Sequence, residues 1–74
     1  MMKRYEKNIG KIMPIRNFGE YRGKEIKFCK LVKIIQMDVN VYYLDFFSED
    51  MELLGSRWIT GHMYRYHVLN KPYW

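Results

Sequence analysis

Side chains alternate with a period of two along two neighbouring stretches of the sequence, residues 26–34 and 39–47. The alternating positions are Ile26, Phe28, Lys30, Val32 and Ile34, followed by Val39, Val41, Tyr43, Asp45 and Phe47. This period is typical of β-strands, because successive side chains of a strand point to opposite faces. The few residues between the stretches leave room only for a turn. The sequence therefore predicts an antiparallel hairpin within residues 25–47, and no other segment constrains the fold as strongly.

A two-residue turn at Met37-Asp38 gives this hairpin its most economical register. It places Lys30 opposite Asp45, the only charged residues of the two alternating sets, so that opposite charges face each other across the strands. The remaining pairs are Phe28 with Phe47, Val32 with Tyr43, and Ile34 with Val41. A four-residue loop at 37–40 would set Lys30 against Phe47 instead. Met-Asp is not a favoured hairpin dipeptide, which counts against the two-residue turn.

The second face of the same hairpin is also partly apolar. Leu31, Leu44 and Phe46 lie on it, together with Cys29, which we expect to pack as a small hydrophobic residue. A flat sheet with one wet face would not need these side chains. Either the strands bend until both faces are partly covered, as in a small barrel, or this face meets a partner. For a single domain of 74 residues the barrel is the economical interpretation.

The remaining segments are shorter. Residues 1–9 predict a polar arm or a single helical turn, and the glycine spacing in residues 17–23 predicts a loop or tight turn between short strands. Residues 48–55 fit either a short helix capped by Ser48 or a hairpin tip. We favour the hairpin, because nucleating a helix of so few residues is costly. The tail, residues 70–74, ends in two aromatic residues and is expected to dock on the domain or on a partner.

Residues 56–69 predict a strand, a tight turn at Thr60-Gly61 and a last short strand. A glycine, then Trp58-Ile59, then a turn and an aromatic residue before a final strand resembles the closing segment of SH3-like small β-barrels. The resemblance implies the fold only, because Thr60 stands where those domains usually carry a proline. The expected fold is therefore all-β or mostly β, a small antiparallel β-barrel or strongly bent sheet, SH3-like, with a short N-terminal arm or helical turn.

Composition argues against several classes of protein. The single cysteine allows no internal disulfide, which favours a reducing, cytoplasmic location, and no apolar run is long enough to span a membrane. His62 and His67 are five residues apart, a spacing that suits zinc ligands on neither a strand nor a helix. No nucleophile elbow, phosphate-binding glycine loop or kinase motif occurs. We expect one domain over residues 1–74, without metal, cofactor or enzymatic activity.

Charge is strongly polarised along the chain. Counting Lys and Arg against Asp and Glu gives +7 over residues 1–33, −5 over 34–56 and +3 over 57–74, for a net +5. Cations interleaved with aromatic rings suit single-stranded nucleic acid, because the cations meet phosphates and the rings stack on bases. The candidate residues are Arg22, Lys24, Lys27, Lys33, Tyr42, Arg57, Arg65 and Tyr66. The competing interpretation is that the cations only keep a small domain soluble while the rings fill its core.

A second hypothesis is a protein-binding inhibitor or adaptor, of the compact kind that phages and mobile elements encode, which docks on a host enzyme or on a protein of a nucleic-acid-handling complex. Aromatic side chains anchor protein interfaces, and an acidic patch suits a basic groove. The candidate residues are Asp38, Glu49, Asp50, Glu52, Tyr73 and Trp74. A homodimer is compatible with either hypothesis. Among the rings, Trp58 is expected in the core, whereas Tyr42, Tyr66 and the terminal pair are expected at the surface.

Overall fold

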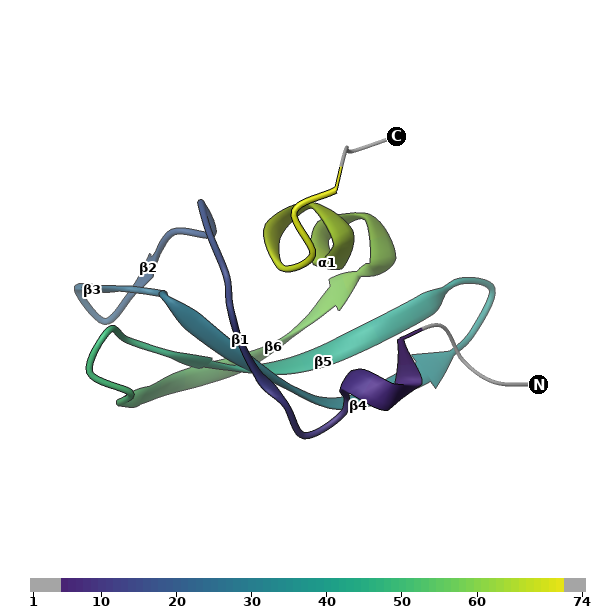
Figure 1. Ribbon diagram of the computed structural model, residues 1–74, viewed down its shortest axis with the longest axis horizontal. Helices are drawn as coiled ribbons and strands as arrows, with labels where there is room; N and C mark the ends of the chain where they lie inside the picture. Colours follow the sequence, from purple (N-terminus) through teal and green to yellow (C-terminus); the bar gives the residue numbers. More distant parts are fainter. Residues whose placement is uncertain (1–4, 72–74) are drawn as a thin grey trace.

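A computed structural model describes residues 5–71 of the chain (Figure 1). Its elements are a 3₁₀ turn η1 (Glu6–Asn8), six strands and one helix. The strands are β1 (Ile12–Pro14), β2 (Glu20–Tyr21), β3 (Lys24–Glu25), β4 (Phe28–Gln36), β5 (Asn40–Phe47) and β6 (Leu53–Thr60), and the helix is α1 (Gly61–His67). The prediction of a mostly β, antiparallel fold with an N-terminal helical turn is confirmed.

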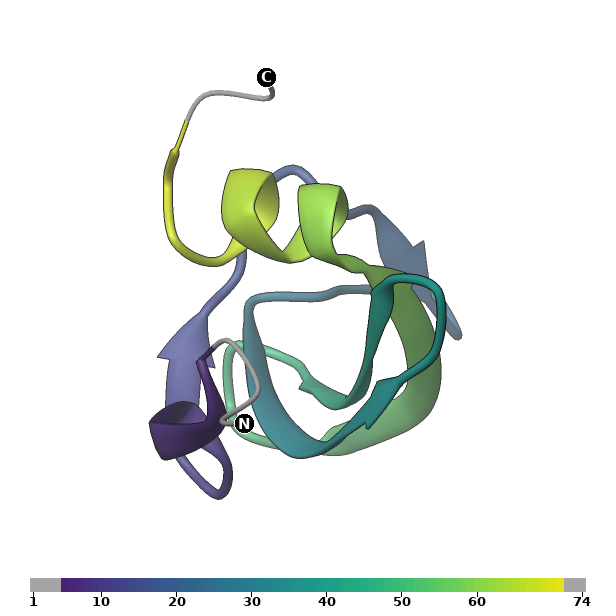
Figure 2. The same ribbon diagram turned by 90° about the vertical axis from the view of Figure 1, so that its right-hand side faces the viewer.

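Four strands form one antiparallel sheet in the order β1-β4-β5-β6, and β2 pairs only with β3. Within residues 5–71 the two edge strands, β1 and β6, do not pair with each other, so no closed barrel is found. The sheet instead curls strongly around its interior, with α1 over the open side (Figure 2). Of the two expected architectures, the strongly bent sheet is the one observed. No helix in the described residues is long and apolar enough to cross a membrane.

The predicted hairpin register is confirmed over its first half and wrong over its second. Phe28 lies opposite Phe47 and Lys30 opposite Asp45, but the register shifts between Leu31 and Lys33. Val32 is the extra residue of this irregularity, so the predicted pairs Val32–Tyr43 and Ile34–Val41 do not form. The shift accompanies a three-residue loop at 37–39, in which the Met37 N–H donates to the Val39 carbonyl at 3.1 Å. Met-Asp lacks the residues that a two-residue turn requires.

The irregularity at Val32 brings Leu31 and Ile34 to the same face of the sheet, the concave one. This face, and not the set of residues around Phe28 and Tyr43, forms the core. The buried residues of the core, which come from this face and from the segments packed on it, are Ile15, Ile26, Cys29, Leu31, Ile34, Tyr42, Leu44, Phe46, Leu54, Ile59, Tyr64 and Val68. The sequence expectation for two rings is therefore wrong. Tyr42 is buried and Trp58 is 41% exposed on the opposite, convex face.

The chain after β6 forms a helix, and the predicted last strand is wrong. The Thr60 hydroxyl accepts a hydrogen bond from the Met63 N–H at 3.3 Å, which satisfies one of the unpaired donors of the first helical turn. Tyr64 and Val68, four residues apart, then face the core together. The Tyr64 ring stacks on Tyr42, with centroids 4.8 Å apart and an interplanar angle of 4°. A capping threonine and this spacing outweigh the strand propensity of the tyrosines.

The turn predicted within residues 17–23 and the hairpin tip favoured for residues 48–55 are confirmed. Arg22 and Gly23 join β2 to β3 with φ angles of 56° and 79°, the positive values that a tight two-residue hairpin turn needs. Residues 48–52 form a hairpin tip between β5 and β6, as favoured over a helix. The expectations for residues 1–4 and for the terminal aromatic pair lie outside the described residues.

We expect substitution of Tyr64 to destabilise the fold more than substitution of Trp58, the ring that the sequence predicts in the core. Tyr64→Ala removes a fully buried, stacked ring and is expected to cost about 3–5 kcal/mol of unfolding free energy. Trp58→Ala, on the convex face, should cost about 1 kcal/mol or less. Urea denaturation followed by circular dichroism measures both. A larger loss for Trp58→Ala than for Tyr64→Ala would contradict the assignment of the core.

Burial also governs the chemistry of the lone thiol. Cys29 is 1% exposed, and burial raises the pKa of its thiol to about 12 from 9.0. At pH 8 we expect alkylation of the folded protein to be at least roughly a hundredfold slower than that of the unfolded chain, because only the thiolate reacts. The raised pKa contributes stability that is present below pH 9 and is lost as the pH rises toward 12. Thiol titration with and without urea tests the first expectation and alkaline unfolding the second.

Candidate functional site

The predicted nucleic-acid-binding residues do not form one surface. Lys24 of β3 forms an ion pair with Glu52, and Lys27 lies 3.5 Å from the carboxylate of Glu25 (Nζ to Oε1). The hydrogen bond and charge of Glu52 raise the pKa of Lys24, and the charge of Asp50 adds to this. Both lysines are thus compensated by neighbouring carboxylates.

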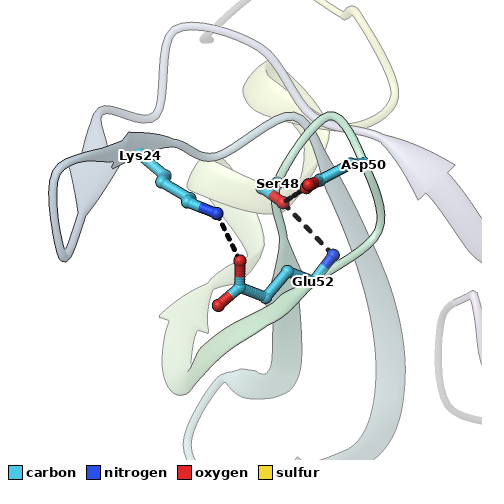
Figure 3. Close-up of polar contacts among 4 residues, drawn as sticks. All are labelled: Lys24, Ser48, Asp50 and Glu52. Carbon is cyan, nitrogen blue, oxygen red and sulfur yellow. Dashed lines mark hydrogen bonds and ion pairs between the residues drawn. The ribbon is translucent and has the colours of Figure 1, made fainter.

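The predicted acidic patch is divided by the fold. Glu49, Asp50 and Glu52 lie at the β5–β6 tip, whereas Asp38 lies in the β4–β5 loop at the opposite end of β5 (Figure 1). At the tip, the Ser48 hydroxyl donates to Asp50 and accepts from the Glu52 N–H (Figure 3). The Ser48 hydrogen bond, with the charge of Lys24, lowers the pKa of Asp50. Tyr73 and Trp74, the aromatic part of that hypothesis, lie outside the described residues.

The tip and the β2–β3 hairpin enclose a cleft of about 430 Å³. It is lined by Lys24, Glu25, Lys27, Ser48, Glu49 and Asp50. Two lysines and three carboxylates line it, so their fields largely cancel at any ligand placed there. Basic and acidic residues that are separated along the sequence therefore neutralise each other at this end of the molecule.

Three further candidate residues are also separated. Tyr42 is buried under α1 and presents no ring to a ligand, so its assignment to a binding surface is wrong. Lys33 lies on the convex face, with its Nζ 5.6 Å from the ring centroids of both Tyr43 and Trp58. Arg65 donates from its guanidinium to Nδ1 of His62, 3.2 Å away, on the helix.

Arg57, Tyr66 and Arg22 remain, and the fold joins them to residues that the sequence analysis did not select. Arg57 lies opposite Leu44 in the β5–β6 register and so points toward the concave side of the sheet. Its guanidinium carbon is 5.6 Å from the centroid of the Phe18 ring. Phe18 packs on buried Phe46, with centroids 5.0 Å apart, and meets the ring of His67 edge-on at 5.1 Å.

Helix α1 holds the next part of this surface against the loop after β1. The guanidinium of Arg16 donates to the Tyr66 carbonyl at 3.2 Å, and its carbon lies 5.6 Å from the Tyr66 ring centroid. Nδ1 of His67 donates to the Arg16 carbonyl at 2.8 Å, and the Arg16 N–H donates to the His67 carbonyl at 3.1 Å. These bonds fix the position of Arg16 relative to the two rings.

Gly55 of β6 positions the other end of the surface. A Cβ placed on Gly55 would lie 2.8 Å from Cε2 of Tyr21, so only glycine lets the β2–β3 hairpin approach β6 this closely. The guanidinium carbon of Arg22 is 5.6 Å from the Tyr21 ring centroid. Arg57 follows Gly55 by two residues and so shares its face of the strand.

We call these seven residues the cation–aromatic strip. Its members are Arg16, Phe18, Tyr21, Arg22, Arg57, Tyr66 and His67. The three arginines are exposed and form no ion pair with any carboxylate in residues 5–71. Glu20, the neighbour of Tyr21 on β2, points to the opposite face of that strand. The strip is therefore a surface of uncompensated positive charge with rings between the charges.

Four members of the strip were not among the candidates from the sequence: Arg16, Phe18, Tyr21 and His67. Phe18 and Tyr21 fall within residues 17–23, which were expected to form a turn. The adjacency of cation and ring in Arg16-Asn17-Phe18 and Tyr21-Arg22 was the available signal, and it matches that in Arg65-Tyr66. No group of three or more potential metal ligands occurs in the part of the chain that the structure describes. A scan of protein-family models and searches of curated proteins and of solved structures each gave no match to this chain.

The contact between Gly55 and Tyr21 generates a test of how the strip is built. Gly55→Ala forces the Tyr21 ring to move, and we expect it to cost about 1–2 kcal/mol of unfolding free energy. In a Tyr21→Ala background the same substitution should cost a few tenths of a kcal/mol, because the opposing ring is gone. Chemical denaturation of the four proteins gives the coupling. Equal costs in the two backgrounds would show that Tyr21 does not pack on Gly55.

Proposed function

We propose that this protein is a non-catalytic binding protein that holds single-stranded nucleic acid along the cation–aromatic strip. The observation that carries the proposal is the alternation of three uncompensated arginines with accessible rings on one surface. Guanidinium groups bind phosphate oxygens in a bidentate manner, and nearby rings offer faces on which bases stack. A polynucleotide strand presents this same alternation of phosphate and base.

The arrangement favours a single strand over a duplex. Reading a duplex usually requires a projecting helix or ribbon that enters a groove. The helix α1 is short, and its Tyr64 and Val68 are committed to the core. Ring stacking, by contrast, needs unpaired bases. Since every base has a stacking face, we expect little sequence preference.

The SH3-like interpretation of the fold is likewise a proposal. It is supported by the antiparallel β4, β5 and β6 strands, which curve around one core. In this interpretation, α1 takes the place of the last strand of SH3-like barrels.

Salt dependence tests the proposed function. Titration of a fluorescent oligothymidine by anisotropy between 50 and 200 mM salt should give a slope of log K against log [salt] of about −2 for three phosphate contacts. Arg57→Ala should weaken binding at low salt and reduce the magnitude of the slope by about 0.7. Lys33→Ala is the matched control, since it removes one positive charge from the convex face and should leave the slope unchanged.

The rings are tested in the same assay. Tyr21→Leu should weaken binding by about 5- to 150-fold, the equivalent of about 1–3 kcal/mol for one lost stacking contact, whereas Tyr43→Leu on the convex face should not. Equal losses of affinity for Arg57→Ala and Lys33→Ala would mean that binding depends only on the net charge of the protein. That result would overturn the assignment of the strip. A discrete protein recovered from lysate after nuclease and salt treatment, with no oligonucleotide binding, would instead support the adaptor or inhibitor hypothesis.

A further inference from the structure

The convex face of the four-stranded sheet is apolar and uncovered by any described element. The 3₁₀ turn and α1 add apolar side chains to the concave face, where Tyr5 and Met63 pack against the core. On the convex face and its adjoining β4–β5 loop, six large apolar side chains are between 40% and 69% exposed. They are Ile12, Ile35, Met37, Val39, Leu53 and Trp58. An apolar surface of this extent on a small domain marks an interaction site.

A charged pair lies across the middle of this face. Lys30 of β4 is directly opposite Asp45 of β5, as the alternation in the sequence predicts. The two side chains nevertheless form no ion pair. One oxygen of Asp45 accepts the Ser56 hydroxyl at 2.6 Å, and Lys30 has no carboxylate partner in residues 5–71. The face therefore presents Lys30 and Asp45 side by side without an ion pair, and Lys33 lies farther along it beside the Tyr43 and Trp58 rings.

We propose that a second copy of this chain packs its convex face against the convex face of the first. The two copies are related by a twofold axis that lies between the two sheets, parallel to the strands and over the line between β4 and β5. In a twofold interface a contact from one residue to another occurs twice, once in each direction. This axis places Lys30 against Asp45 of the partner subunit and, reciprocally, Asp45 against the partner's Lys30. It also places Phe28 against Phe47 of the partner subunit, since those residues are paired in the register. Two aligned sheets packed in this way form a β-sandwich.

The balance of charge selects a second copy as the occupant. When two identical convex faces meet about this axis, Lys30 of each copy lies against Asp45 of the other, so these charges are complementary. The cation–aromatic strip cannot meet itself in this way, because its arginines would repel one another. A twofold sandwich leaves the strip of each copy exposed on the outside.

A hollow at the β4–β5 end of the face supports the same packing. Its volume is about 280 Å³, and it is lined by Ile35, Met37, Val41 and Trp58. An axis parallel to the strands brings the two β4–β5 loops to the same end of the dimer. The exposed side chains of Met37 and Val39 can then fill the hollow of the partner subunit and lose their contact with water.

The test is the oligomeric state of charge-reversal variants, measured by analytical ultracentrifugation from about 5 to 500 μM. The wild-type chain should dimerise. Lys30→Glu makes both members of the Lys30–Asp45 pair acidic and Asp45→Lys makes both basic, so each variant alone should be monomeric. An equimolar mixture of the two variants should form a heterodimer, because every cross-interface pair is then again of opposite charge. Lys71→Glu and Glu20→Lys, away from this face, are the matched controls and should dimerise as the wild type does.

Each outcome decides the proposal. A wild-type chain that stays monomeric at 500 μM overturns it, as do single variants that self-associate like the wild type or a mixture that stays monomeric. Circular dichroism melting of each variant excludes unfolding as the cause, since like charges opposite each other on an exposed face destabilise a strand pair only slightly. The measurement uses no nucleic acid, so failure of the dimer leaves the proposed function standing, and failure of oligonucleotide binding leaves the dimer standing.

Discussion

The stacking of Tyr64 on Tyr42 holds the only helix of the described chain against the concave face of the sheet. A chain of this size has one short helix with which to cover a four-stranded sheet, so one face is buried and the other stays open. Which face is buried follows from the irregularity at Val32, which turns Leu31 and Ile34 to the same side. The same docking of α1 brings Tyr66 and His67 beside Arg16 and so completes the cation–aromatic strip.

Charge along the chain is resolved by the fold into three local environments. At the β5–β6 tip, Lys24 and Glu52 neutralise each other, and the cleft between the two hairpins mixes both signs. On the strip, each arginine lies beside a ring, Arg16 also donates to a backbone carbonyl, and none pairs with a carboxylate of the described residues. On the convex face, Lys30 and Asp45 lie side by side without pairing. The net charge of +5 thus understates how differently the surfaces behave.

Much of the strand arrangement was predictable because it depends on local pattern. The opposition of Phe28 to Phe47 and of Lys30 to Asp45, the turn at Arg22-Gly23 and the tip after Ser48 all follow from alternation and turn chemistry. The candidate site was predicted only in part. Arg22, Arg57 and Tyr66 belong to the strip, but Tyr42 is buried and Lys33 is on the opposite side of the sheet. A period of two separates the faces of a strand without saying which one is covered, because both faces here are half apolar.

The sequence by itself determined that residues 25–47 form a hairpin, that the fold is mostly β and antiparallel, and that cations and rings occur next to each other along the chain. These properties depend on neighbours within a few residues. Only the tertiary structure decided which face became the core, that residues 61–67 became a helix in place of a strand, and which cations remained uncompensated. Those outcomes depend on contacts between distant segments, such as Tyr64 with Tyr42 and Lys24 with Glu52. The free energy of such a contact cannot be inferred from the pattern of neighbouring residues.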